Sequence, residues 1–202
     1  MKTLLAAMLI LTSMALTAHA QEGRGQTHIQ RGKLFTALIS GDNNLEVTCN
    51  ADGVILLKES LMDTDAGKYL EDTTYGQPYR IADFNFDGYD DIANPSNSGN
   101  VQRFEQVYLY DPVKKALVAN TALSDIACLD IDPGTKTVSG NCFHTSAAEN
   151  WTETYQWQGK KLILVEREGT LPGPGAAEYY YQYRQKRVKG KMVYVYKRKV
   201  RY

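Results

Sequence analysis

The sequence has few of the residues and segments on which catalysis or membrane insertion depends. Histidine occurs only three times in 202 residues, and no serine or cysteine motif accompanies His144, so a catalytic triad is unsupported. The longest apolar segment, Leu4–Leu16, is shorter than the roughly 20 residues that a bilayer-spanning helix needs. These shortages argue against a triad enzyme and against a transmembrane protein.

The first twenty residues have the pattern of a secretory signal peptide. Lys2 supplies the positive start, Leu4–Leu16 is almost wholly apolar, and Ala18-His19-Ala20 has the small-x-small form of a cleavage site. No cysteine directly follows that site, so a lipid anchor is not expected. We expect residues 1–20 to be removed and the mature chain to begin near Gln21, as a soluble periplasmic or secreted protein.

Cysteine is also scarce, with three residues in the chain. Export would place them in an oxidising compartment, where disulfides persist. Cys128 and Cys142 flank residues 129–138, which read as strand, turn and strand, and a hairpin brings its two ends close enough to bridge. We therefore predict a Cys128–Cys142 disulfide and an unpaired Cys49. Three buried thiols, or a bridge from Cys49 to one of the other two, remain open alternatives.

Short strand-like runs with turn signals between them recur along the chain, which predicts a mainly β fold of antiparallel strands and hairpins. A polar, Gly-containing stretch precedes them, and a Pro/Gly-rich stretch follows residue 169. The last 25 residues read as two aromatic and basic strands that pair through Lys189-Gly190-Lys191. The expected organisation is a signal peptide (1–20), a flexible leader (21–32), a β domain (33–169), a linker (170–177) and a basic aromatic β-hairpin extension (178–202).

Charge is balanced overall, with 23 basic and 23 acidic residues, but it is unevenly spread. Residues 184–202 contain nine basic residues and no acidic one, whereas residues 21–183 contain 13 basic and 23 acidic ones, a formal charge of −10. A basic segment of this kind could bind nucleic acid, but an exported protein rarely meets it. Anionic envelope polymers, lipid headgroups or an acidic protein are the better candidates, and a solvated segment without any partner is the plain alternative.

The most informative segment is the loop from Asp83 to Asp91. Gly88 at its sixth position permits a sharp turn, and the oxygen donors around it recur at the spacing of a calcium-binding loop. Calcium accepts six to eight oxygens in irregular geometry, which suits this set better than the strict octahedron of magnesium. The expected Ca²⁺ ligands are the side chains of Asp83, Asn85, Asp87 and Asp91 and the carbonyl of Tyr89, whereas Asp90 should point away.

The loop is EF-hand-like in its chemistry but not in its surroundings. Asn94 occupies the twelfth position, where an EF-hand has a bidentate glutamate, and the flanking residues read as strands instead of helices. The sequence therefore predicts an EF-hand-like calcium loop in a β domain. A metal-free hairpin turn rich in Asp, Asn and Gly is the alternative.

Residues 83–92 resemble the calcium loop of FG-GAP and VCBS repeats, which form β-propeller blades. Only one copy is present, so the count excludes a full propeller. The order of motifs over residues 79–165 is similar to that in a family of small exported bacterial proteins with a single such loop. That family includes immunity-type inhibitors of peptidoglycan hydrolases delivered by type IV secretion, with a fold like that of periplasmic lysozyme inhibitors. The resemblance implies a non-enzymatic protein whose partner is a peptidoglycan hydrolase.

Two other functions compete with this reading. Glu149, Trp151, Glu153 and Tyr155 place carboxylates beside aromatic rings, but a glycosidase needs two carboxylates about 5–10 Å apart across a cleft. As alternate residues of one strand they share a face, so solvated glutamates beside packed aromatics are expected. The second competitor is an envelope-associated module that binds glycan or anionic polymer through the basic C-terminal segment and inhibits nothing.

Overall fold

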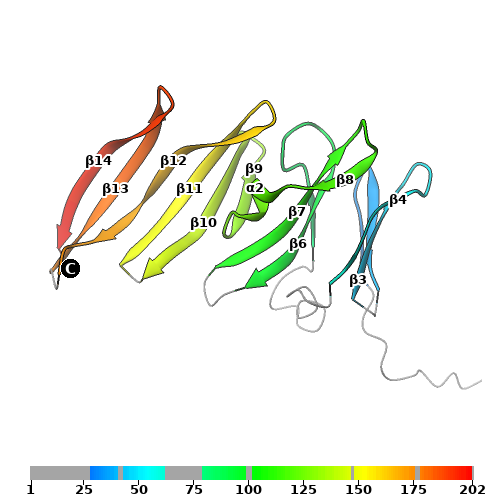
Figure 1. Ribbon diagram of the computed structural model, residues 1–202, viewed down its shortest axis with the longest axis horizontal. Helices are drawn as coiled ribbons and strands as arrows, with labels where there is room; N and C mark the ends of the chain where they lie inside the picture. The colour runs from blue at the N-terminus through cyan, green and yellow to red at the C-terminus, as the bar shows by residue number, and fades with distance from the viewer. Residues whose placement is uncertain are drawn as a thin grey trace, which may run out of the picture.

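The computed structural model describes residues 28–40, 43–61, 79–98, 102–146, 148–175 and 178–201. Within these ranges the chain forms fourteen strands and one short helix, and the strands make three antiparallel sheets. The expected signal peptide lies outside the described residues. The prediction of a mainly β, antiparallel fold is confirmed. The three sheets stand in a row, from the N-terminal sheet at one end to β14 at the other (Figure 1).

The first sheet is a meander of four strands in sequence order: β1 (His28–Arg31), β2 (Phe35–Ile39), β3 (Asn44–Cys49) and β4 (Ile55–Ser60). Alternate residues of β2 are fully buried, as a strand with one covered face requires. In β3, Leu45 and Val47 lie opposite Ile39 and Ala37 and complete the apolar face. The end of the expected leader differs from our prediction, because His28–Arg31 pairs with β2 as a strand.

The middle sheet contains β5 (Arg80–Ala82), β6 (Asp91–Ser98), β7 (Arg103–Asp111) and β8 (Ala116–Ala119), again in sequence order. Both of its faces are covered. Ile92 belongs to a core shared with the first sheet, while the next residue, Ala93, belongs to a second core shared with the third sheet. Successive side chains of a strand point to opposite faces, so adjacent residues of β6 contribute to different cores.

The third sheet has six strands: β9 (Leu129–Asp132), β10 (Thr137–Ser146), β11 (Glu149–Gln158), β12 (Lys161–Pro172), β13 (Tyr179–Val188) and β14 (Lys191–Arg201). The short helix α2 (Thr121–Ser124) connects it to β8, and the Asn120 side chain caps the helix by accepting a hydrogen bond from the Leu123 N–H. Cys128 and Cys142 are bonded across the β9–β10 hairpin, with their Cα atoms 5.6 Å apart. Cys49 is free. The predicted disulfide pairing is confirmed.

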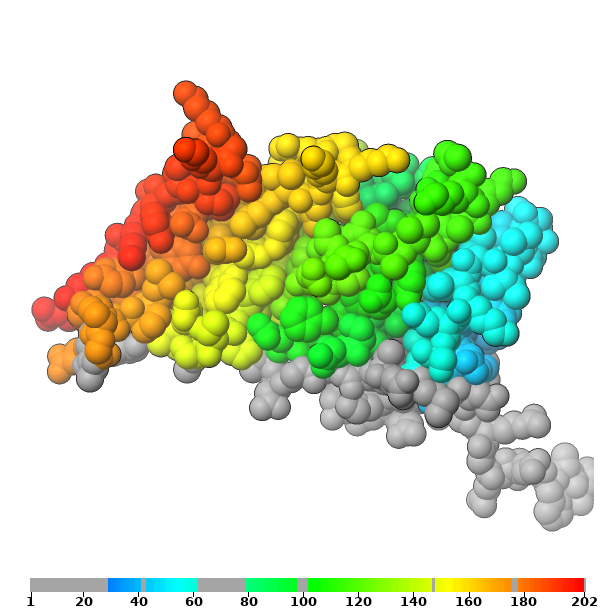
Figure 2. Space-filling model, viewed as in Figure 1, coloured from blue at the N-terminus to red at the C-terminus, as the bar shows by residue number. Residues whose placement is uncertain are grey.

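The C-terminal hairpin is continuous with this sheet. Strand β12 runs to Pro172, inside the segment expected to be a linker, and β13 pairs with it from Glu166↔Lys186 to Pro172↔Tyr180. The extension is therefore the outer third of the sheet, and Figure 2 shows it forming one end of the molecule. No helix in the described part of the chain is long and apolar enough to cross a membrane.

Candidate functional site

The loop predicted to bind calcium connects β5 to β6. Gly88 has φ +93°, a conformation that L-residues with a side chain rarely adopt, and Phe86 has φ +59°. The Phe84 ring is fully buried in the second core, and the Trp157 indole N–H donates to the Phe84 carbonyl at 3.0 Å. The loop is thus anchored by one of its own side chains, while Asp87, Gly88 and Tyr89 are exposed.

Three of the expected ligands fold back onto the loop's own backbone. The carboxylate oxygens of Asp83 accept the N–H groups of Asp87 and Gly88 at 3.1 and 2.8 Å. The amide oxygen of Asn85 accepts the Asp87 N–H at 3.2 Å, and Asp87 accepts the Tyr89 N–H at 3.0 Å. Each of these oxygens keeps a second lone pair. The three side chains are therefore held on one turn with acceptor capacity to spare.

Asp91, the fourth expected side-chain ligand, is fully buried. Its two carboxylate oxygens accept the N–H groups of Phe84 and Tyr110, both at 2.8 Å, so it ties the loop to β7. Burial raises the pKa of this carboxyl from 3.8 to about 7, although the two hydrogen bonds lower it. Asp91 is thus a structural link between two strands as well as a candidate ligand, a role that its spacing alone did not reveal.

Asp90 points elsewhere, and its carboxylate accepts the N–H of Leu34, in the turn between β1 and β2, at 2.8 Å. Among the described residues, no group of three or more His, Cys, Asp and Glu side chains could hold a metal by itself. A calcium ion at this loop would therefore need the Asn85 amide oxygen and a backbone carbonyl in its ligand set. Oxygen donors of this mixed kind are the ones that calcium takes.

The carboxylates that resembled a glycosidase pair are engaged in other contacts. Glu153 is only 6% exposed, and it accepts hydrogen bonds from the Trp151 indole at 3.1 Å, from Arg167 Nε at 2.7 Å and from the Tyr155 hydroxyl. Our expectation of a solvated Glu153 is wrong, because Arg167 on the next strand neutralises it inside the sheet. Glu149 accepts the Thr145 hydroxyl at 2.5 Å. Strand periodicity placed residues 149, 151, 153 and 155 on one face, but it gave no signal for Arg167, fourteen residues beyond Glu153.

No family model matches the chain, and no curated protein matches it either. A solved structure described as a Xanthomonas type IV secretion system related protein has a similar fold, with a TM-score of 0.54. The alignment covers 85% of each chain at 20% sequence identity. At this identity the similarity shows the fold alone.

Proposed function

We propose that this chain is an exported, calcium-stabilised β protein that binds and inhibits a peptidoglycan hydrolase. The observation that carries the proposal is the shared fold over 85% of a protein described as related to a type IV secretion system. The family that residues 79–165 resemble includes inhibitors of peptidoglycan hydrolases delivered by type IV secretion. A cell exposed to such hydrolases needs an inhibitor. The Cys128–Cys142 disulfide supports action in an oxidising compartment.

The charge distribution supports a protein partner of opposite sign. Residues 21–183 carry a formal charge of −10. Many wall hydrolases carry positive charge, because they must approach an anionic wall, and complementary fields speed the encounter of two proteins. The inhibitor's acidic part then includes the first two sheets, the calcium loop and the inner strands of the third sheet.

The contacts of Glu153 support inhibition over hydrolysis by the carboxylates of β11. Glu153 is a buried carboxylate between Trp151 and Tyr155 in the strand, and Arg167 neutralises its charge. A general acid or nucleophile must be able to exchange a proton or attack the substrate. A carboxylate that already accepts from an indole, a phenol and a guanidinium is poorly placed for either role.

Turbidity assays on cell-wall suspensions test the proposal with the mature chain and hydrolases encoded beside its gene. We expect the chain alone to leave the wall intact and to lower the activity of a cognate hydrolase in a one-to-one complex. Raising salt should slow association more than it speeds dissociation. Lysis by the chain alone, or no inhibition of any neighbouring hydrolase, would refute the proposal.

The second part of the proposal concerns calcium. The ligands are the side chains of Asp83, Asn85, Asp87 and Asp91 and the carbonyl of Tyr89. What supports this set is the turn itself, because the Asp83, Asn85 and Asp87 oxygens are already gathered by hydrogen bonds to residues 87–89. Extracellular calcium modules bind at about 10⁻⁴–10⁻³ M, which sets the concentration range to explore. The ion's role would be to fix the loop that connects β5 to β6.

A further inference from the structure

The outer end of the third sheet lies beyond both hydrophobic cores. The second core reaches as far as Leu162 at the start of β12. Among the described residues of β13 and β14, Tyr183 is the one buried hydrophobic residue. Strand β14 is the terminal strand of its sheet, and Tyr194 and Val195 are 52% and 56% exposed. This end of the molecule therefore presents the β14 edge to the outside (Figures 1 and 2). No other described element is stacked on the two faces of β13 and β14 (Figure 1).

Strand β14 carries positive charge that no carboxylate of the described residues neutralises. On the neighbouring β13, Arg184 and Lys186 form ion pairs with Glu166 at 2.5 and 3.2 Å. In the described structure the basic side chains of β14 form no such pair. Lys197 and Lys199 instead lie over the rings of Tyr181 and Tyr179, 4.7 and 3.6 Å from the ring centroids. A cation held over an aromatic ring keeps its charge for an anionic ligand.

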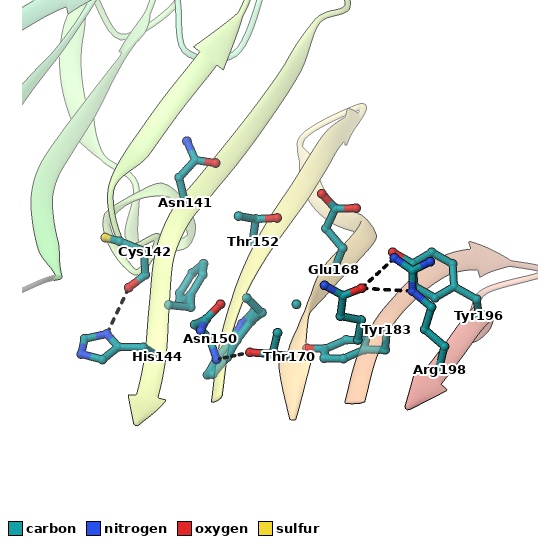
Figure 3. Close-up of a pocket in the computed structure, with 14 residues that line it drawn as sticks. Asn141, Cys142, His144, Asn150, Thr152, Glu168, Thr170, Tyr183, Tyr196 and Arg198 are labelled. Atoms are coloured by element: carbon teal, nitrogen blue, oxygen red, sulfur yellow. Dashed lines mark hydrogen bonds between the residues drawn. The ribbon is translucent and has the colours of Figure 1, made fainter. Parts of the chain in front are cut away.

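The opposite face of the same strands is hollowed. A depression of about 540 Å³ crosses β10 to β14, the five strands that contribute its lining (Figure 3). Its lining combines aromatic rings with amides and hydroxyls, which both donate and accept hydrogen bonds. The amides and hydroxyls include Asn141, Asn150, Thr152, Thr170 and Gln182. The lining also contains one carboxylate, Glu168, which pairs with Arg184 at 3.9 Å.

One full positive charge is fixed at the rim of the depression. Arg198 donates from Nε and Nη2 to the Gln182 side-chain oxygen at 3.0 and 2.7 Å (Figure 3). Its partner is a neutral amide, so the guanidinium keeps its charge, and it retains further N–H groups for a ligand. The planar guanidinium is suited to a carboxylate, which it can bind through two parallel hydrogen bonds.

We propose that this end of the third sheet is a second binding site, for an acidic glycan. A sugar segment lies in the depression with its hydroxyls on the amide and hydroxyl side chains, and a carboxylate of the glycan binds Arg198. The lysines of β14 supply the positive field that attracts the chain. A peptide strand added to the β14 edge would leave the depression empty, and a bare polyanion would have no use for its neutral donors and acceptors. The site goes beyond the proposed inhibition, and it would hold the inhibitor at an anionic polysaccharide.

Binding is measured by calorimetry on the mature chain at low salt, with an oligogalacturonate as acidic probe. A chito-oligosaccharide of equal length is the neutral probe, and polyglutamate is the peptide polyanion. We expect the acidic oligosaccharide to bind more tightly than either of the others and to weaken as salt rises. Arg198→Gln should weaken it at least about tenfold, because a charge-assisted contact is lost. Lys160→Gln removes the same charge from the exposed β11–β12 turn, outside the depression, and should leave the affinity unchanged.

Several results would overturn the site. Equal binding of polyglutamate would show that charge alone is recognised, and equal binding of the neutral probe would remove the role of Arg198. Equal losses in Arg198→Gln and Lys160→Gln would point to net charge instead of a site, and no binding of any probe would refute the site outright. Melting curves of both variants establish that they are folded. The assay contains no hydrolase, so its failure and a failure of inhibition are separate results.

Discussion

Trp151 lies directly across from Gly169 in the β11–β12 pair, and its Cβ is 2.6 Å from the position that a Cβ on Gly169 would occupy. Such a Cβ would also overlap the Asn150 carbonyl oxygen. The glycine therefore lets the backbone of β11 at residues 150 and 151 approach β12 closely. Gly169 is needed for close packing, not for an unusual backbone angle.

Gly169→Ala should destabilise the fold for this reason. Inserting a methyl group into a packed site costs typically about 1–3 kcal/mol, because backbone or side chains must shift. Urea unfolding measures the change in the free energy of unfolding. Gly134→Ala is the matched control, because its Cβ would meet only the exposed Asp132 side chain. An equal effect of the two substitutions would contradict the packing argument.

The disulfide should contribute strongly to stability, because it closes a loop between residues 14 positions apart. In the chain-entropy model a loop of this size is worth about 3 kcal/mol. We expect the Cys128→Ser, Cys142→Ser double variant to melt at lower temperature and to lose its response to reducing agent. Cys49→Ser is the control and should keep the full response. A reductant effect that disappears in Cys49→Ser would mean that the pairing in solution is different.

Local features of this fold were predictable from the sequence, and contacts between distant residues were not. The strand-like run of residues 34–39 is a local property of the sequence, and it coincides with β2. The Cys128–Cys142 pairing could be predicted because a hairpin fixes the distance between its ends. The contact of Glu153 with Arg167 depends on which strand pairs with β11, and a strand pattern does not encode that choice. The same reason explains why the terminal hairpin was expected as a separate extension.

The loop from Asp83 to Asp91 shows the same division within nine residues. Spacing predicted the sharp turn, and the side-chain oxygens at positions 83, 85 and 87 accept N–H groups of that turn. The second role of Asp91 needed the structure, because its partner Tyr110 is nineteen residues away. Both Asp90 and Asp91 look alike in the sequence, yet one binds the turn between β1 and β2 and the other is buried beside β7.

Asp91→Asn should destabilise the apo protein, and Asp90→Asn should not. Asp91 uses both carboxylate oxygens to accept N–H groups, so an amide in its place would turn an NH₂ toward one of these donors. A buried donor without an acceptor costs about 1–3 kcal/mol. Asp90 accepts through Oδ2 in its bond to Leu34, and an asparagine can supply that oxygen. Urea unfolding in the presence of chelator compares the two; equal losses would contradict this assignment.

The stability of the apo protein should also depend on the ionisation of Asp91. Burial raises its folded-state pKa from 3.8 to about 7. Between these values the folded state holds a proton that the unfolded state has lost, so the free energy of unfolding falls as pH rises through this window. We expect the wild type in chelator to lose more stability between pH of about 4.5 and 7.5 than Asp91→Asn does. Parallel pH profiles of the two proteins would show that Asp91 titrates normally.

Calcium should raise the melting temperature of the mature chain, and chelator should lower it to the apo value. Ligand that binds only the native state stabilises it by mass action, by about 2.7 kcal/mol at a hundred times Kd. Magnesium should do less, because the loop offers an irregular oxygen set instead of an octahedron.

Asp87→Asn separates the metal's effect from that of the turn. Asp87 accepts the Tyr89 N–H through Oδ1, which an asparagine keeps, whereas the negative charge that attracts calcium is lost. Its Oδ2 accepts the Asn85 side-chain amide at 2.8 Å, an exposed bond that water can replace in the variant. The variant should therefore melt close to the wild type in chelator but show little rise with calcium. Asp90→Asn removes the same charge from a side chain that binds the turn between β1 and β2 and should keep most of the rise. Wild-type melting curves that coincide with and without calcium, together with no heat on titration, would show that the loop is a metal-free turn.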